Sequence, residues 1–377
     1  MDIASYINQL LHRAVQIKAS DVHIEPQNDA LRIRMRVDGQ LFETGKIDLF
    51  HATAVVSRIK VMSRLDIGEK RIPQDGVFSF QSDKQKIEVR ISTLPTIYGE
   101  KVVMRILRLH EKPYTMEELG LESDQQHKIK NVLCKNSGLM IVTGPTGSGK
   151  TTTLYTLLEA LNKSRANIVS LEDPVELQLD GINQVQIHPK SGLTYARALR
   201  AVMRQDPDVI MIGEIRDEEI AKIAVSAALT GHLVLTTLHT ADAAKAVIRL
   251  LDLKVEPYRL AASLIGIIAQ RLVRKVCIGC DGDGCTHCRQ TGYQGRTGVF
   301  EVVEVNDELA EQIVHQDTWL QIREALAGSG MKTLEEMMME CVKKGKTTME
   351  EWVRVVDGNA AEAVDKKTVE FRAIHGV

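Results

Sequence analysis

One octapeptide near the middle of the chain reads Gly144-Pro145-Thr146-Gly147-Ser148-Gly149-Lys150-Thr151 and matches the phosphate-binding pattern G-x-x-x-x-G-K-[ST]. The apolar run 138–143 predicts a buried strand before it, and the apolar spacing in 151–160 predicts a helix after it. In this context the glycines let backbone amides surround a phosphate, while the helix N-terminus and Lys150 attract it. Thr151 can offer its hydroxyl to Mg²⁺. The sequence therefore predicts a nucleoside triphosphate site, and the residues predicted to bind the nucleotide are Gly144, Pro145, Thr146, Gly147, Ser148, Gly149, Lys150, Thr151 and Thr152.

The length and composition limit the class of protein. A chain of 377 residues is long enough for two or three domains, and 44% hydrophobic with 26% charged residues is ordinary for a soluble globular protein. The net charge of −2 argues against a protein whose main role is to hold nucleic acid. The start lacks the basic and apolar regions of a signal peptide, and the longest apolar stretch, 260–269, is too short to span a bilayer. We expect a cytoplasmic protein that reaches the membrane only through a partner.

Residues 1–108 are predicted to form a small α/β module. The segment 31–37 alternates between apolar and arginine residues, which predicts a strand with one buried face. Its three arginines form either a solvated sheet face or a surface for a phosphate or a neighbouring subunit. These arginines are Arg32, Arg34 and Arg36. Further elements predicted here are a hairpin turn at Asp38-Gly39, a helix over 51–64, and strands over 87–92 and 101–107.

The rest of the chain is predicted to form a second domain, 117–377, after a linker at 109–116. The linker is polar, contains a proline and breaks the periodicity. Beyond it, helical patterns alternate with apolar strands, which predicts a parallel sheet with helices on both faces. These strands cover 167–171, 209–212 and 233–238. From about residue 256 onward the chain is predicted to be mainly helical, interrupted by a cluster of cysteines.

Three segments beyond the phosphate loop carry the polar groups that nucleotide hydrolysis requires. The segment 169–176 places three carboxylates just past a strand end, and 204–217 holds an apolar strand that ends in a glutamate. The segment 230–240 is a strand flanked by histidines. In open parallel sheets the ligand lies beyond the carboxyl ends of the strands. We therefore expect these strand ends to converge on the phosphate loop.

In this order, the four segments resemble the Walker A motif, Asp box, Walker B motif and His box of the secretion ATPase superfamily, the motors of type II secretion and type IV pilus assembly. Upstream, 19–26, 72–76 and 88–95 resemble the module that precedes the motor domain in that family, and 292–301 matches downstream. The resemblance covers roughly residues 10–356. It implies an α/β fold with a RecA-like P-loop motor domain, preceded by a PAS-like α/β domain and followed by a zinc knuckle and a helical C-terminal region.

The resemblance also implies roles for individual residues. Lys150 and Thr151 would bind phosphate and Mg²⁺, and Glu214 would polarise the attacking water. Carboxylates of the Asp box would lie near the metal and water, histidines of the His box would sense the terminal phosphate, and arginines of the N-terminal module would reach the phosphates, often across a subunit boundary. The residues with implied catalytic roles are Glu214, Glu172, Glu176, His232, His239, Arg90 and Arg71.

Two positions depart from common patterns. Gly213 stands where many P-loop enzymes have a magnesium-binding aspartate, and the secretion ATPases share this glycine. Metal positioning would then depend on Thr151, phosphate oxygens, water and Glu172. Val77 stands where this family often has an arginine, which removes one expected phosphate contact.

Four cysteines follow the spacing C-x₂-C-x₄-C-x₂-C over 277–288. Two such turns can present four thiolates to one tetrahedral Zn²⁺ and leave no open position, which predicts a structural metal site. The short loop between the pairs leaves an iron–sulfur cluster or an imperfect site as alternatives. Gly282 and Gly284 ease the return between the pairs, and His287 is expected to be a bystander. The predicted metal ligands are Cys277, Cys280, Cys285 and Cys288, while the isolated Cys134 and Cys341 are expected to pack as small apolar groups.

As a whole, the resemblance implies an ATP-hydrolysing homo-hexamer with ATP, Mg²⁺ and Zn²⁺. It would power assembly of a type IV pilus, competence pilus or type II secretion pseudopilus through a polytopic inner-membrane platform protein, with no direct nucleic acid and no direct membrane insertion. The early start of the 19–26 motif suggests the short form found in competence systems. The alternatives are a pilus-retraction ATPase, which lacks the cysteine knuckle, and a nucleic-acid translocase, which the aromatic content of 4% disfavours.

Overall fold

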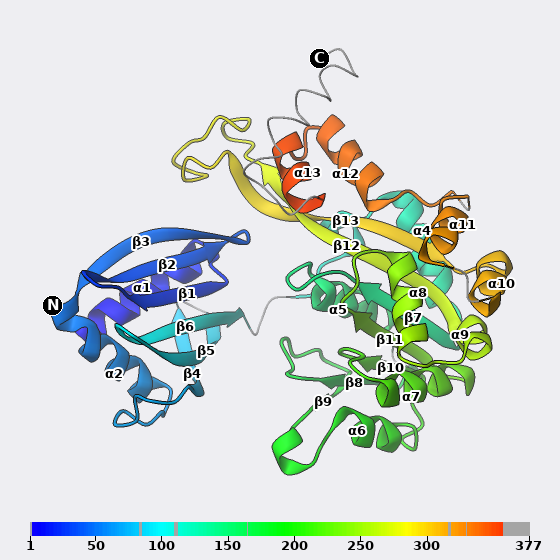
Figure 1. Cartoon of the computed structure of the whole chain (residues 1–377), viewed down its shortest axis with the longest axis horizontal. Coiled ribbons are helices and arrows are strands. Elements are labelled where there is room, and N and C mark those ends of the chain that lie inside the picture. Colours follow the sequence, from blue (N-terminus) through cyan, green and yellow to red (C-terminus); the bar gives the residue numbers. More distant parts are fainter. Residues whose placement is uncertain are drawn as a thin grey trace. The chain divides into compact units, whose positions relative to one another are not determined.

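The chain forms two compact units. The first contains Met1–Lys112, and the second contains Pro113–Val175 and Leu179–Val377 (Figure 1). The computed structural model describes residues 2–82, 85–108, 112–163, 165–315, 318–328 and 330–356. Residues 109–111 of the predicted linker, and the segment 357–377, lie outside the described residues.

The first unit is a six-stranded antiparallel sheet with the strand order β3-β2-β1-β6-β5-β4. Two helices pack their apolar residues against one face of this sheet and form a single hydrophobic core with it. The elements are α1 (Ile3–Gln16), β1 (Asp21–Pro26), β2 (Ala30–Val37), β3 (Gln40–Asp48), the 3₁₀ helix η1 (Leu49–His51), α2 (Ala52–Met62), β4 (Gln74–Ser82), β5 (Gln85–Thr96) and β6 (Gly99–Arg108). The strands and helix predicted for this region are confirmed. The hairpin turn is confirmed as well, since Asp38 and Gly39 both have positive φ, +49° and +87°.

The sheet face opposite the two helices carries an ion-pair network. Arg34 donates two hydrogen bonds of 2.8 Å to Glu25, and Arg32 and Lys101 approach the same carboxylate at 3.2 and 3.1 Å. Burial acts to raise the pKa of Glu25, but the hydrogen bonds from Arg34 and Lys101 hold it at about 2. Arg36 lies 3.9 Å from Asp21. The predicted arginine face is therefore neutralised largely within its own sheet.

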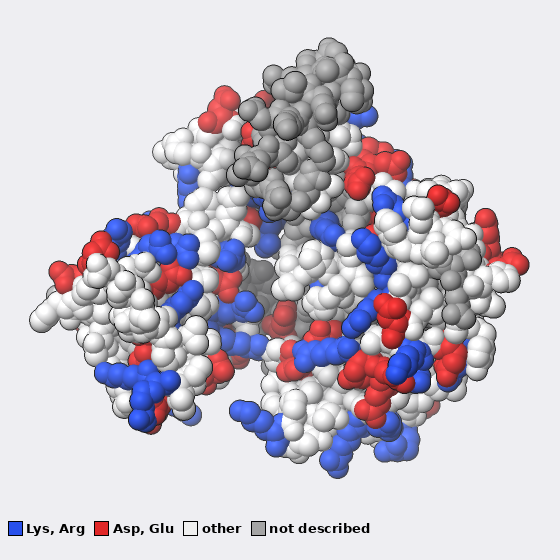
Figure 2. Space-filling view, in the orientation of Figure 1, with Lys and Arg blue, Asp and Glu red and all other residues white. Residues whose placement is uncertain are grey.

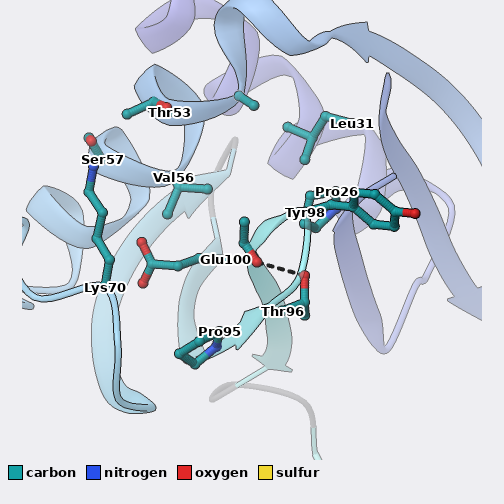
Figure 3. Close-up of a pocket in the computed structure, with 12 residues that line it drawn as sticks. Pro26, Leu31, Thr53, Val56, Ser57, Lys70, Pro95, Thr96, Tyr98 and Glu100 are labelled. Carbon is teal, nitrogen blue, oxygen red and sulfur yellow. Dashed lines mark hydrogen bonds between the residues drawn. The ribbon is translucent and has the colours of Figure 1, made fainter. Parts of the chain in front are cut away.

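A cavity lies between α2 and the β5–β6 hairpin of this unit (Figure 3). Leu31, Val56 and Tyr98 supply apolar surface to it, and Glu100 lines it with a carboxylate. Glu100 pairs with Lys60, which is only 1% exposed and donates a 2.6 Å hydrogen bond to the carbonyl of Glu69. The pair links α2 to β6, and loss of either partner would leave a costly unpaired charge in the buried site.

The second unit is built on a seven-stranded sheet with the strand order β13-β12-β7-β11-β10-β8-β9. Every neighbouring pair is parallel except β12 with β13, so the predicted parallel sheet is confirmed. All residues of β7, β10 and β11 are buried, as expected for strands with helices on both faces. The strands are β7 (Gly138–Thr143), β8 (Ile168–Glu172), β9 (Asn183–Gln186), β10 (Val209–Ile212), β11 (Leu233–Leu238), β12 (Leu264–Val276) and β13 (Tyr293–Glu304).

The helices of the second unit connect and cover these strands. Figure 1 shows α5 beginning where the chain leaves β7, and α12 and α13 lying beside the β12–β13 hairpin. The helices are α3 (Met116–Leu119), α4 (Ser123–Leu133), α5 (Lys150–Leu161), η2 (Pro189–Ser191), α6 (Tyr195–Val202), α7 (Glu218–Leu229), α8 (Ala243–Asp252), α9 (Pro257–Ser263), α10 (Asp307–His315), α11 (Trp319–Gly328), α12 (Leu334–Lys343) and α13 (Met349–Val356).

The prediction of a mainly helical region after residue 256 is wrong in part. Two long strands, of 13 and 12 residues, form an antiparallel hairpin there and extend the central sheet. The apolar run in 264–276 is rich in β-branched residues, and β12 pairs with β7, so burial against the sheet favours an extended chain. Periodicity alone does not separate such a buried strand from a buried helix. The prediction for Cys134 is also wrong, because it is exposed at the end of α4, while Cys341 is buried as expected.

Candidate functional site

The phosphate loop connects the buried strand β7 to α5, as the sequence predicts. Gly147 and Gly149 have φ of +78° and +90°, a region that other residues rarely adopt. The hydroxyl of Thr143, the last residue of β7, contacts the hydroxyl of Thr240 at 2.7 Å and donates to the carbonyl of Leu238 at 3.2 Å. These contacts fix the end of β7 against the end of β11, where the loop begins.

Lys150 points back into the loop. Its ammonium donates hydrogen bonds of 2.8 and 3.0 Å to the carbonyls of Gly144 and Pro145 and lies 3.4 Å from Nδ1 of His239. The residue is 8% exposed, and burial lowers its pKa to about 8, opposed by the charge of Glu214. A buried cation with two backbone acceptors is suited to attract an anion into the loop.

Glu214 follows β10 and is engaged on both of its oxygens. Oε2 lies 3.0 Å from Nε2 of His239, and Oε1 accepts a charged hydrogen bond from Arg216. Burial acts to raise the pKa of Glu214, but Arg216 and His239 outweigh it and hold the pKa below its usual range. The structure thus forms a continuous line from Lys150 through His239 and Glu214 to Arg216.

The backbone beside Glu214 is too crowded for a larger residue at Gly213. A Cβ at this position would lie 2.9 Å from the hydroxyl oxygen of Tyr195 and 3.2 Å from the carbonyl of Leu171. The carbonyl of Gly213 accepts a 2.7 Å hydrogen bond from Thr237, and its amide donates to Leu171. The packing around Gly213 therefore leaves little room for a side chain at this position.

Glu172 is held in place by three donors. This residue ends β8, is 3% exposed, and accepts hydrogen bonds from Tyr155, Ser170 and Gln184 at 2.5, 2.5 and 3.0 Å. Because both of its oxygens are engaged, the carboxylate links α5, β8 and β9 at the carboxyl edge of the sheet. The structure places Glu176, the other predicted Asp-box residue, exposed in the loop between β8 and β9.

The two predicted histidines lie at opposite ends of β11. His239 follows the strand and joins the site, whereas His232 precedes it, with Nδ1 3.0 Å from the carbonyl of Ala227. The register pairs Leu233 with the first residue of β7 and Leu238 with the last. Six residues of strand span about 20 Å. Within this chain the length of β11 therefore separates His232 from the phosphate loop, whereas His239 lies beside the loop.

The predicted arginines lie on the first unit. Arg90, in β5, pairs with Glu88 on its own strand at 3.2 Å. Arg71 lies in the segment before β4, is 88% exposed in its side chain, and pairs with Glu69 at 2.9 Å. The side chain of Arg90 is partly exposed and that of Arg71 is largely exposed, and each pairs with a nearby glutamate.

The four cysteines of the predicted metal site converge. Their sulfur atoms all lie within 4.8 Å of one another, with separations of 3.7 to 4.0 Å for the pairs in contact. Four thiolates bound at about 2.3 Å to a tetrahedral ion would be about 3.8 Å apart, so the arrangement fits a four-thiolate metal. The cluster occupies the loop between β12 and β13, and His287 stays outside it with a 2.9 Å contact to Gln294.

Sequence reasoning missed two neighbours of Glu214. Arg216 bonds its carboxylate, and Tyr195 lies beside Gly213 with its pKa raised, first by burial and then by Glu214. Arg216 could have been noticed because it stands two residues after the glutamate at a strand end. Tyr195 gives no comparable signal, because it is distant in sequence and only the folded sheet brings it near.

Comparison with known proteins gives concordant matches. A family model described as "Type II/IV secretion system protein" matches residues 1–354. The chain is 49% identical to Type II secretion system protein HxcR of Pseudomonas aeruginosa, covering 93% of this chain and 76% of that protein. It is 45% identical to Type II secretion system protein E of Pectobacterium carotovorum, covering 94% and 75%. It is 42% identical to Type IV pilus assembly ATPase PilB of Thermus thermophilus, covering 92% of this chain and 42% of that longer protein.

Solved structures share the fold. The ATPase DotB of Legionella pneumophila has a TM-score of 0.75 at 20% identity, covering 94% of this chain and 96% of that one. The pilus retraction motor PilT with bound ADP has a TM-score of 0.66 at 25% identity, covering 93% and 96%.

We predict that Gly213→Ala destabilises the second unit by about 1–3 kcal/mol, because the new methyl group would press on the Tyr195 hydroxyl. The additional change Tyr195→Phe removes that hydroxyl and should recover part of the loss. Denaturant unfolding of the two single variants and the double variant measures the coupling. Strictly additive effects would show that the hydroxyl is not what excludes a side chain here.

Proposed function

Because the chain belongs to the type II/IV secretion system protein family, we propose that it is an ATP-hydrolysing hexameric motor for assembly of a type IV pilus, competence pilus or type II secretion pseudopilus. The observation that carries the proposal is a series of side-chain contacts: Lys150 of the phosphate loop contacts His239, and His239 contacts the carboxylate of Glu214. Relatives at 42% to 49% identity are named for type II secretion and for pilus assembly. This favours assembly over retraction.

In the proposed reaction the loop amides and Lys150 hold the phosphates of ATP. Lys150 would exchange its hydrogen bonds to the Gly144 and Pro145 carbonyls for hydrogen bonds to phosphate oxygens. The negative charge of the phosphate would raise the pKa of Lys150. The Thr151 hydroxyl would hold Mg²⁺ together with phosphate oxygens, and the ion would neutralise charge on the transferred group. Glu172, with both oxygens already bonded, would keep α5 and β8 in register rather than bind the metal directly.

Glu214 is the proposed group that orients the attacking water. Its low pKa keeps it ionised at neutral pH, and the two hydrogen bonds from Arg216 and His239 fix its carboxylate plane. His239 contacts both Glu214 and Lys150, so a terminal phosphate against Lys150 would change the position of His239 and with it Glu214. This gives a physical means for Glu214 to respond to the presence of that phosphate.

Charge stabilisation would be completed by arginines of the first unit. Arg90 and Arg71 are exposed enough to leave their glutamate partners, and exposed ion pairs of this kind contribute little. We propose that they contact phosphate across a subunit boundary of the hexamer. The proposed partner of the ring is a polytopic platform protein of the inner membrane. Among the residues that the structure describes, no helix is long and apolar enough to cross a membrane.

A nucleic-acid translocase on the same fold is the second candidate. On the face shown in Figure 2, Lys and Arg side chains are interspersed with Asp and Glu, and no broad basic patch is visible. The net charge of −2 agrees with this distribution. A translocase needs a basic groove and stacking aromatic residues, which makes this candidate weaker.

We predict that Glu214→Gln lowers the rate of ATP hydrolysis by about 10²–10⁴-fold, because the amide keeps the shape but loses the negative charge and the ability to accept a proton. ADP affinity should change little, since the loop and Lys150 remain. Steady-state hydrolysis and ADP titration measure the two quantities. The matched control is Glu219→Gln, which removes an exposed glutamate that pairs with Arg200. Unchanged turnover in Glu214→Gln would refute the proposed role of Glu214.

The assembly role is tested by purifying the protein from its native host with its partners. We expect a polytopic membrane protein together with a pilin-like cargo. Recovery of DNA without a membrane protein, together with a severalfold stimulation of hydrolysis by single-stranded DNA, would favour the translocase.

We also propose that the cysteine cluster binds one structural Zn²⁺ per chain, since its sulfur separations fit tetrahedral thiolate coordination. Metal analysis of the purified protein should find about one zinc per chain, and Cys280→Ser should lose most of it. Cys134→Ser is the control, because that cysteine is exposed and outside the cluster. Iron instead of zinc, or equal zinc in both variants, would contradict this assignment.

A further inference from the structure

The strand β12 continues past the end of β7 and lies against the phosphate loop. The register pairs Ala269 with Thr143, so the next residue of β12, Gln270, stands beside Gly144, the first residue of the loop. The carbonyl oxygen of Gln270 is 2.6 Å from where a Cβ on Gly144 would lie. A Cβ on Gly149 would lie 3.2 Å from Nε2, the side-chain amide nitrogen of Gln270. Gln270 therefore touches both ends of the glycine turn.

The side chain of Gln270 makes one short hydrogen bond, and it is to the loop. Nε2 donates to the carbonyl of Ser148 at 2.6 Å, and the residue is 1% exposed. Among the described residues, neither Oε1 of Gln270 nor the hydroxyl of Ser148 has a hydrogen-bond partner. The hydrogen bonding between the Gln270 side chain and the loop thus rests on this single donor, which is buried from water.

This bond constrains the direction of a backbone amide in the loop. In a planar trans peptide the carbonyl and the following N–H point in opposite directions. Drawing the Ser148 carbonyl toward β12 therefore turns the N–H of Gly149 away from the strand, toward the inside of the loop. Backbone N–H groups at this place in such loops are the donors that hold phosphate.

We propose that Gln270 is a positioning residue for the phosphate loop, which aims the Gly149 N–H by holding the Ser148 carbonyl. The inference rests on the proposed function, because it assumes that this loop binds the phosphates of a nucleotide. It goes beyond that function by adding a residue that follows the loop by more than a hundred positions and carries no charge.

The test compares two buried glutamines that make the same kind of bond. Gln125 is 5% exposed and its Nε2 donates to the carbonyl of Phe300 at 2.8 Å. Gln125→Leu and Gln270→Leu each remove a side-chain bond to a backbone carbonyl, and Gln125→Leu also removes the 3.1 Å bond that Oε1 accepts from the N–H of Glu122. A purely structural role therefore predicts a loss of stability in Gln125→Leu at least as large as in Gln270→Leu. For each variant we would measure the affinity for ADP by titration and the KM and kcat for ATP. A positioning role predicts that these quantities change in Gln270→Leu and not in Gln125→Leu.

We expect Gln270→Leu to weaken ADP binding and raise the KM for ATP by about tenfold or more, the usual effect of misplacing one hydrogen-bond donor, with kcat changed less. Gln270→Met should weaken ADP binding similarly, because methionine keeps the length of the side chain but has no donor for the Ser148 carbonyl. Gln125→Leu should bind ADP like the wild type.

Two results would overturn the proposal: wild-type ADP affinity in both Gln270 variants, or an equal loss of affinity in Gln125→Leu. If Gln270→Leu does not fold, the unbranched Gln270→Met keeps the comparison with the Gln125 variant available. Failure of the unaltered protein to bind ADP would instead contradict the proposed function, so the two failures are distinguishable.

Discussion

The parallel register of β7, β11 and β10 is the constraint on which the site depends. It brings the phosphate loop after β7, His239 after β11 and Glu214 after β10 to one edge of the sheet. The hydroxyl of Thr143 and that of Thr237 bond the backbone of neighbouring strand ends, so the three ends are tied together. Without this alignment the chain would hold the same residues but no continuous path between a phosphate and a carboxylate.

Within this frame, buried charges are tolerated because each has a partner. Lys150 bonds two loop carbonyls, Glu172 accepts three hydrogen bonds, and Glu25 in the first unit is surrounded by cations. An unpartnered buried charge would cost several kcal/mol. These groups are therefore held in defined positions, and of these three only Lys150 has neutral acceptors that a phosphate could replace without leaving another charge unpaired.

Much of the fold and part of the site follow from the sequence by local rules. The pattern GxxxxGK[ST] between a strand and a helix locates the loop, and the polar residues at or just after strand ends, Glu172, Glu214 and His239, locate the edge of the sheet. The same rules gave a poorer result where the signal was not local. Local patterns predict a mainly helical region from about residue 256 onward, yet pairing with β7 makes 264–276 a strand. His232 and His239 carry the same local pattern, yet only the register separates them.

The sequence by itself determined which chemistry is available, because a phosphate loop, an acidic strand end and four clustered cysteines each depend on residues close together in the chain. The tertiary structure alone decided which of these groups meet. His239 bonds Glu214 between two strand ends, Tyr195 closes the space at Gly213, and Gln270 holds the loop from a distant strand. Such contacts arise from sheet order and packing between segments far apart in sequence, and no spacing along the chain encodes them.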